Sequence, residues 1–349
     1  MKPLRLLTML AIAILPVSAQ TAEAGYSPLV RSLADTVILP AYQRFEDGMT
    51  VLATETAAYC AAPSPATRQA VETAFAAGMD AWQEVQPIDF GPVTENSRYS
   101  RIQFWPDKGG TAARHMRQAL QNRDPGLTQP GGLTGRSVAL QNLAAYEGLL
   151  FVSLRDGPQI DPYACALATS IARFQATQAR AILDDWRGPY QSVLADPAKA
   201  TELATAMFKA IFTTLDRIIG QKLEPPLGKS LAAAQPKRSE SWRSGHSLAN
   251  IAANLRMAER LYSSRDSFAD RLAAGGSEAM ATGLRRTFEE QIAAAGAIGM
   301  PLFAAVVDAA ARQKLEKLLA DIKDLRILMA GPVAEDLKLV IGFNAQDGD

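Results

Sequence analysis

The spacing of apolar residues along this chain follows the period of an α-helix. Large apolar residues recur at intervals of three and four, with Lys, Glu and Asp between them, as in helices that bury one face. Alternation with a period of two, which would indicate strands, is nearly absent. We therefore expect an all-α protein with almost no sheet. The clearest stripes are Leu167, Ile171, Phe174, Ile182 and Trp186; Met207, Ile211, Leu215 and Ile218; and Leu315, Leu318, Ile322 and Leu325.

Proline and glycine divide this helical pattern near its midpoint. The break at 187–190, Arg-Gly-Pro-Tyr, is followed by a helix start signal at Asp196 and Pro197. We expect an N-terminal helical bundle over 25–192 and a C-terminal helical bundle over 193–349, packed side by side. Each half runs as helices, an irregular stretch and further helices, which indicates an internal duplication.

The first residues have the composition of an export signal. Lys2 and Arg5 precede an apolar run over 6–15, and small residues follow at 17–19. This is the pattern of a secretory signal peptide, here 1–19. The run is too short to cross a bilayer, which takes about 20 residues, and no later stretch is apolar enough. We expect an exported chain without a transmembrane segment.

The charge balance argues against nucleic acid as a partner. The chain has 36 basic and 36 acidic residues, and loss of the leader removes Lys2 and Arg5. Binding to phosphate backbones requires clustered positive charge, which a nearly neutral chain does not indicate.

Two cysteines, Cys60 and Cys165, are the only ones in the chain. In an oxidising compartment, a single pair forms a disulfide more readily than it stays as two free thiols. We predict a bond between them.

Several segments resemble the imelysin family. Residues 101–107, Arg-Ile-Gln-Phe-Trp-Pro-Asp, are similar to the family's R-I-x-F-W-P-D loop. The helix over 140–151 matches the one that bears the family's G-x-H-x-x-E motif, 341–349 are similar to its G-F-N-x-x-D-G-D ending, and 240–250 resemble a helix start in its second bundle. The resemblance covers essentially the whole mature chain. It implies two α-helical bundles with a site between them, a periplasmic or outer-membrane location, and a link to the uptake of iron or another metal.

The chain departs from the family at the metal motif. Glu147 matches the motif glutamate, but Ala144 takes the place of its histidine and Asn142 the place of its glycine. A His and a Glu three residues apart on a helix share one face and can bind one metal ion. Because Ala144 cannot bind a metal, the expected site is incomplete. A metal ion, iron or zinc, with Glu147 as a ligand is left open, and no catalytic residue is assigned.

We expect a ligand-binding cleft between the bundles, although each candidate residue also has a structural interpretation. Glu147 could instead pair with an arginine such as Arg101, and the loop aromatic residues could simply anchor the loop. Asp107 could cap a helix, and the serines near 244 could do the same. The candidate residues are Glu147, Asp107, Arg101, Trp105, Arg243, Ser244, Ser247 and Asn250.

These observations favour a non-hydrolytic binding or accessory protein in metal acquisition, with iron as the metal and a small polar ligand or a metal in the cleft. One alternative is an imelysin-type metallopeptidase, whose zinc would need Glu147, Asp107 and His246 to converge. Another is a structural partner of a periplasmic or outer-membrane protein, which would expose an apolar patch.

Overall fold

The protein folds into helices joined by turns and irregular loops. The computed structural model describes residues 25–340 except 108 and 155–159, and in these residues it has no strand. The predicted all-α fold is thus confirmed. Several helices continue into a π-helical turn, as α10 does over Ile218–Leu223. The predicted signal peptide 1–19 and the family-like ending 341–349 lie outside the described residues.

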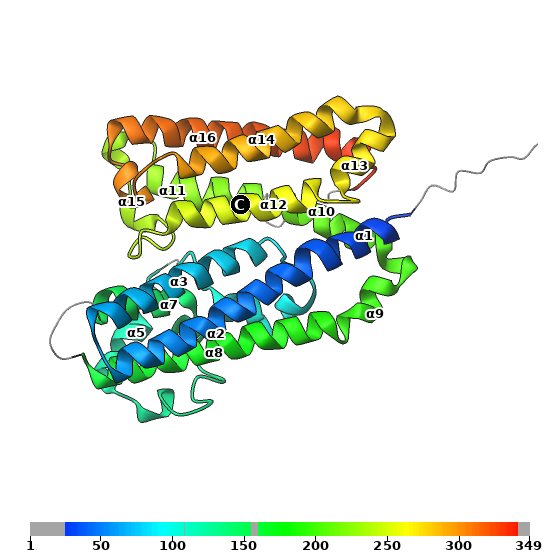
Figure 1. Cartoon of the computed structure of the whole chain (residues 1–349). Helices are drawn as coiled ribbons and strands as arrows, with labels where there is room; N and C mark the ends of the chain where they lie inside the picture. The colour runs from blue at the N-terminus through cyan, green and yellow to red at the C-terminus, as the bar shows by residue number, and fades with distance from the viewer. Residues whose placement is uncertain (1–24, 108, 155–159, 341–349) are drawn as a thin grey trace, which may run out of the picture.

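The helices form two bundles that lie side by side (Figure 1). In the first, α2 packs against both α3 and α8. In the second, α12 packs against α10 and α14, and α16 packs against α14. The first bundle contains α1 (Ser27–Leu33), α2 (Leu39–Ala61), α3 (Pro65–Val85), α4 (Arg98–Ile102), α5 (Thr111–Asn122), α6 (Val138–Gln141), α7 (Leu143–Gly148), α8 (Pro162–Arg187) and α9 (Tyr190–Ala195). The second contains α10 (Ala200–Arg217), α11 (Glu224–Leu227), α12 (Ser247–Ser263), α13 (Phe268–Leu272), α14 (Glu278–Gly296), α15 (Leu302–Ala305), α16 (Ala309–Leu328) and α17 (Ala334–Asp336).

The predicted apolar stripes lie in these helices and face inward. The first stripe lies on α8, the second on α10 with the start of its π turn, and the third on α16. All their residues are buried except Phe174, which is half-buried. The predicted break at 187–190 is also present, because α8 ends at Arg187 and α9 begins at Tyr190. The predicted bundle boundary at 192/193 falls inside α9. That boundary and the internal duplication stay predictions.

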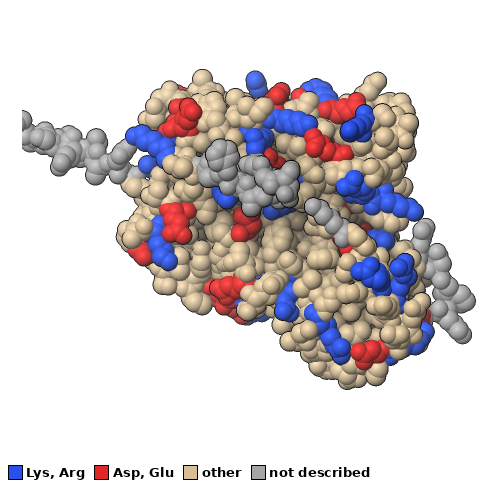
Figure 2. Space-filling model, turned by 180° about the vertical axis from the view of Figure 1, so that it is seen from behind, with Lys and Arg blue, Asp and Glu red and all other residues tan. Residues whose placement is uncertain are grey.

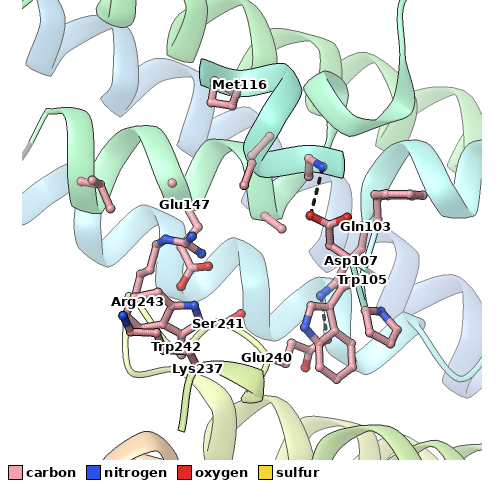
Figure 3. A pocket seen from close by; sticks show the side chains of 18 of the residues that line it. Gln103, Trp105, Asp107, Met116, Glu147, Lys237, Glu240, Ser241, Trp242 and Arg243 are labelled. Atoms are coloured by element: carbon pink, nitrogen blue, oxygen red, sulfur yellow. Dashed lines mark hydrogen bonds between the residues drawn. The ribbon is translucent and has the colours of Figure 1, made fainter. Parts of the chain in front are cut away.

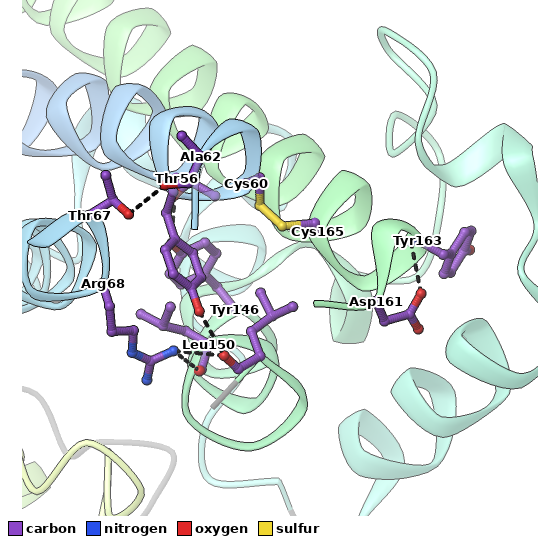
Figure 4. The surroundings of a disulfide bond; sticks show 12 residues. Thr56, Cys60, Ala62, Thr67, Arg68, Tyr146, Leu150, Asp161, Tyr163 and Cys165 are labelled. Carbon is purple, nitrogen blue, oxygen red and sulfur yellow. Dashed lines mark hydrogen bonds between the residues drawn. A yellow bond between two sulfur atoms is a disulfide. The ribbon is translucent and has the colours of Figure 1, made fainter. Parts of the chain in front are cut away.

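A disulfide holds one end of the first bundle together (Figure 4). Cys60 on α2 and Cys165 on α8 are bonded, with Cα atoms 5.6 Å apart, so the predicted pairing is confirmed. Beside it, the Arg68 guanidinium of α3 donates hydrogen bonds to the carbonyls of Leu150, at 2.8 Å, and Leu154, at 3.1 Å. These contacts fix the segment that follows α7, the short helix bearing Glu147.

The two bundles meet where α3 packs against α12. The contact is partly polar, because the Asn254 side chain of α12 donates a 2.7 Å hydrogen bond to the Gln83 carbonyl of α3. Both residues are buried. The surface in Figure 2 shows positive and negative side chains interspersed, with neither sign covering the face. Within the part of the chain that the structure describes, no helix has the length and apolar character to cross a membrane.

Candidate functional site

A cavity of about 740 Å³ opens between the two bundles. Its walls come from the loop 103–107, from α5, from α7 and the turn after it, and from the loop 237–243 of the second bundle. Cavities of this size with a few polar groups are typical sites for small ligands. Figure 3 shows Glu147 projecting from α7 toward the 237–243 loop, where Trp242 and Arg243 lie. The sequence motifs at 101–107, 147 and 240–250 thus meet at one place.

Glu147 is placed by its short helix and held by the second bundle. The Asn142 side chain caps α7 by accepting a 3.0 Å hydrogen bond from the Ala145 amide. Glu147 itself is buried, and its Oε1 accepts hydrogen bonds from Ser244, at 2.9 Å from the amide and 2.8 Å from the hydroxyl. Burial raises the pKa of Glu147, an effect opposed by the two Ser244 bonds and by the positive charge of Arg243.

The turn that presents Ser244 to Glu147 closes on itself. The Ser241 carbonyl accepts hydrogen bonds from the Ser244 hydroxyl and from the His246 amide, both 3.1 Å long. Ser241 has φ +47° and Gly245 has φ +76°, and both residues are left-handed. This backbone conformation is uncommon for serine and easy for glycine, so the turn is a locally specified structure.

Asp107 lines the cavity and also caps α5. Its Oδ1 accepts a 2.8 Å hydrogen bond from the Thr111 amide, and its Oδ2 accepts a 3.0 Å bond from the Ala112 amide. Asp107 thus caps a helix and also lines the cavity, and its role in ligand binding stays a prediction. Trp105, joined to Pro106 by a cis peptide bond, lines the cavity as well.

The other candidates divide into two groups. Arg243 lines the cavity, whereas Arg101 donates a 2.9 Å hydrogen bond to the Asn96 carbonyl and is outside its lining. The alternative pairing of Glu147 with Arg101 is therefore replaced by the contact with Ser244. Ser247 and Asn250 are buried behind the cavity wall, where both bond to Glu240.

A buried ion pair beneath the cavity was not anticipated from the sequence. The Lys222 ammonium lies 2.8 Å from Oε2 of Glu240, and each residue is 1% exposed. Lys222 also donates to the side chains of Gln83, at 2.7 Å, and Gln86, at 3.1 Å, on the first bundle. Burial lowers the pKa of Lys222 to about 8, and Glu240 opposes this shift. The sequence did contain an indication that Lys222 is buried, because this residue continues the apolar stripe four residues after Ile218.

The donor set does not fit a metal ion held by protein ligands alone. Zinc normally takes at least three protein ligands, but the described residues contain no group of three His, Cys, Asp or Glu side chains that could hold an ion. The three residues suggested for zinc have separate partners: Glu147 bonds Ser244, Asp107 caps α5, and His246 Nε2 lies 3.1 Å from Oδ1 of Asp80. Ala144, at the histidine position of the motif, lines the cavity without a ligating atom.

Comparison with known proteins places this arrangement in a family. The family model described as imelysin matches residues 38–329. The iron-regulated protein A of Synechococcus elongatus is 24% identical over 259 residues, which are 70% of this chain and 66% of that protein. The imelysin-like protein of Psychrobacter arcticum 273-4 has the same fold, with a TM-score of 0.77 and 17% identity over 91% of this chain and 97% of that one. An iron-regulated protein A precursor of Parabacteroides distasonis gives a TM-score of 0.72 and 16% identity, over 90% and 96% of the chains. This chain belongs to the imelysin family.

Proposed function

We propose that this protein is a non-hydrolytic binding or accessory protein in iron acquisition, and that its ligand occupies the cavity between the bundles. The observation that carries the proposal is the position of that cavity. It opens where the family's motif helix, through Glu147, meets the 237–243 loop of the other bundle. Two relatives described as iron-regulated protein A point to iron.

The proposed location is the periplasm, with association to the outer membrane as a further possibility to be tested. It rests on the leader-like sequence at 1–19, and the related protein of Parabacteroides distasonis is described as a precursor. The disulfide between Cys60 and Cys165 agrees with an oxidising compartment.

A zinc peptidase is less well supported by the site. A hydrolytic zinc ion needs protein ligands and an open position for the water that it activates. In the described residues, the acidic side chains of the cavity are engaged with Ser244, the α5 amides and Lys222. A binding role requires none of these contacts to break.

The test is a binding measurement on the mature, metal-stripped chain. Ferrous sulfate, ferric citrate, zinc chloride and copper sulfate are titrated separately by calorimetry. The fluorescence of Trp105 and Trp242, which line the cavity, gives a second readout. We expect an iron form to bind and Glu147→Ala to weaken that binding. Glu289→Ala, an exposed glutamate on α14, is the matched control.

A different pattern would overturn the proposal. Binding of no iron form, together with zinc-dependent cleavage of a denatured protein substrate that Glu147→Ala abolishes, would establish the peptidase instead. Iron binding that is equal in both variants would show that Glu147 takes no part in holding the ligand.

A further inference from the structure

The carboxylates that line the cavity are already engaged by the protein. Asp107 accepts two α5 amide bonds, and Glu147 accepts two bonds from Ser244. Glu240 lies 2.8 Å from the Lys222 ammonium. Within the described residues, all three therefore already accept hydrogen bonds from the protein.

The cationic side chains of the cavity are in the opposite situation. Arg117 on α5 and the loop residues Lys237, Arg238 and Arg243 line the same cavity, and all four are exposed. Among the described residues, none of them has a carboxylate within 4.0 Å. Arg238 makes only a 3.5 Å contact with the Gln235 side chain. Four positive charges thus line one cavity without an acidic partner.

An aromatic ring holds two of these cations in place. The Arg243 guanidinium lies 4.6 Å from the Trp242 ring centroid, and the Lys237 ammonium lies 5.6 Å from it. Stacking on an aromatic face orients a guanidinium while its N–H edge stays free to bind a carboxylate through two parallel bonds. Figure 3 shows this Trp242 group beside Glu147.

A buried polar atom without a partner belongs to a residue that lines the same cavity. Ser239 is 1% exposed and lines the cavity, and in the described part of the chain its Oγ has no hydrogen-bond partner. A buried hydroxyl without a partner is unfavourable by about 1–3 kcal/mol. Because this oxygen is closed to solvent, a ligand oxygen would reach it only after a shift of the 237–243 loop.

We infer that the cavity takes a multiply charged organic anion with several carboxylates, held by Arg117, Arg243 and Lys237. The cavity volume of about 740 Å³ suits a small organic molecule better than a single ion. The link to iron rests on the function proposed above: iron would enter as its carboxylate chelate, because the cations of the cavity bind the chelator and repel the bare metal ion.

The experiment titrates trisodium citrate, ferric citrate, inorganic phosphate and ferrous sulfate separately into the mature chain and into Arg117→Gln/Arg243→Gln. We expect both citrate forms to bind, and binding to weaken by about tenfold or more in the double variant, because it loses charge-assisted hydrogen bonds. Binding should also weaken as salt is added. Arg114→Gln is the control, since this exposed α5 residue lies outside the cavity lining and contacts Thr111. Circular dichroism verifies that each variant is folded.

The outcomes separate this inference from the proposed function. If only ferrous sulfate binds, and Glu147→Ala but not the arginine variant abolishes it, the carboxylate ligand is wrong and the iron function stands. Phosphate binding as tight as citrate binding would also overturn the carboxylate assignment. If citrate binds but ferric citrate does not, the result supports the anion site and contradicts the iron function. If no probe binds, both fail.

Discussion

Glu147 and Glu240 are buried carboxylates of the same cavity, yet the protein stabilises them in opposite ways. Glu240 is paired with the Lys222 ammonium and accepts further bonds from Gln103, at 2.6 Å, and Asn250, at 2.8 Å. Glu147 has only the amide and hydroxyl of Ser244 as hydrogen-bond donors among the described residues. The first carboxylate forms an ion pair, whereas the second has two neutral hydrogen-bond donors and the more distant positive charge of Arg243.

This difference assigns the two residues different roles. A fold that contains a buried ion pair is strongly destabilised when one member is lost. Since Lys222 and Glu240 also bond glutamine side chains of the first bundle, the pair joins the two bundles. A carboxylate without a paired cation has a raised pKa and can respond to what enters the cavity. We therefore expect the network beneath the cavity to be structural, and Glu147 to belong to the proposed ligand site.

The largest expected effect comes from breaking the ion pair. Lys222→Met leaves the Glu240 charge buried without its partner and should lower the free energy of unfolding by about 3–5 kcal/mol, measured by urea denaturation. The double variant Lys222→Met/Glu240→Met removes both charges and should recover most of this loss. A single variant as stable as the parent would show that the pair is not structural.

A smaller effect is expected on the Glu147 side. Ser244→Ala removes one of the two hydrogen bonds to the buried carboxylate and should lower the free energy of unfolding by about 2 kcal/mol. Glu147→Gln keeps an acceptor for both Ser244 donors and removes the buried charge, so this variant should be at least as stable as the parent at neutral pH. If Glu147→Gln proved as damaging as Lys222→Met, the contrast between the two carboxylates would be wrong.

The third carboxylate of the cavity, Asp107, should show a smaller effect on stability than either of these. Asp107→Ala removes the side-chain acceptor of the Thr111 and Ala112 amides and should lower the free energy of unfolding by about 1 kcal/mol, as other lost caps do. Hydrogen exchange provides the local measurement: relative to the parent, Asp107→Ala should speed amide exchange at the start of α5 but not at the start of α3. An equal change in exchange rate at the starts of both helices would rule out the capping role.

The smallest effect is a pH dependence that distinguishes Glu147 from Glu240. The folded pKa of Glu147 is raised, so the folded state binds more protons than the unfolded state above the ordinary value of 4.5. Its stabilising contribution is present below pH 4.5 and is lost as the pH rises through the folded pKa. Glu147→Gln should therefore gain stability relative to the parent between pH 4.5 and neutrality, as followed by urea denaturation. If the difference in unfolding free energy between variant and parent stays constant over this pH range, the raised pKa is contradicted.

The sequence determined the helices, the disulfide and the segments that meet at the cavity, because apolar periodicity, cysteine number and local motifs are properties of neighbouring residues or of composition. It also gave Glu147 and Arg243 as candidates, and both line the cavity. It could not separate them from Ser247 and Asn250, since the side of a loop or helix that faces a cavity depends on the partner bundle.

Only the tertiary structure decided how the charges are paired. Irregular loops lie between Lys222 and Glu240, and Glu147 and Ser244 are 97 residues apart in different bundles, so no single helix connects either pair. Sequence alone indicated an incomplete metal motif at Ala144 and Glu147. Among the described residues, the packed bundles place four cations without an acidic partner around the same cavity. Electrostatic partners are chosen by distance in space, which the order of residues along the chain does not specify.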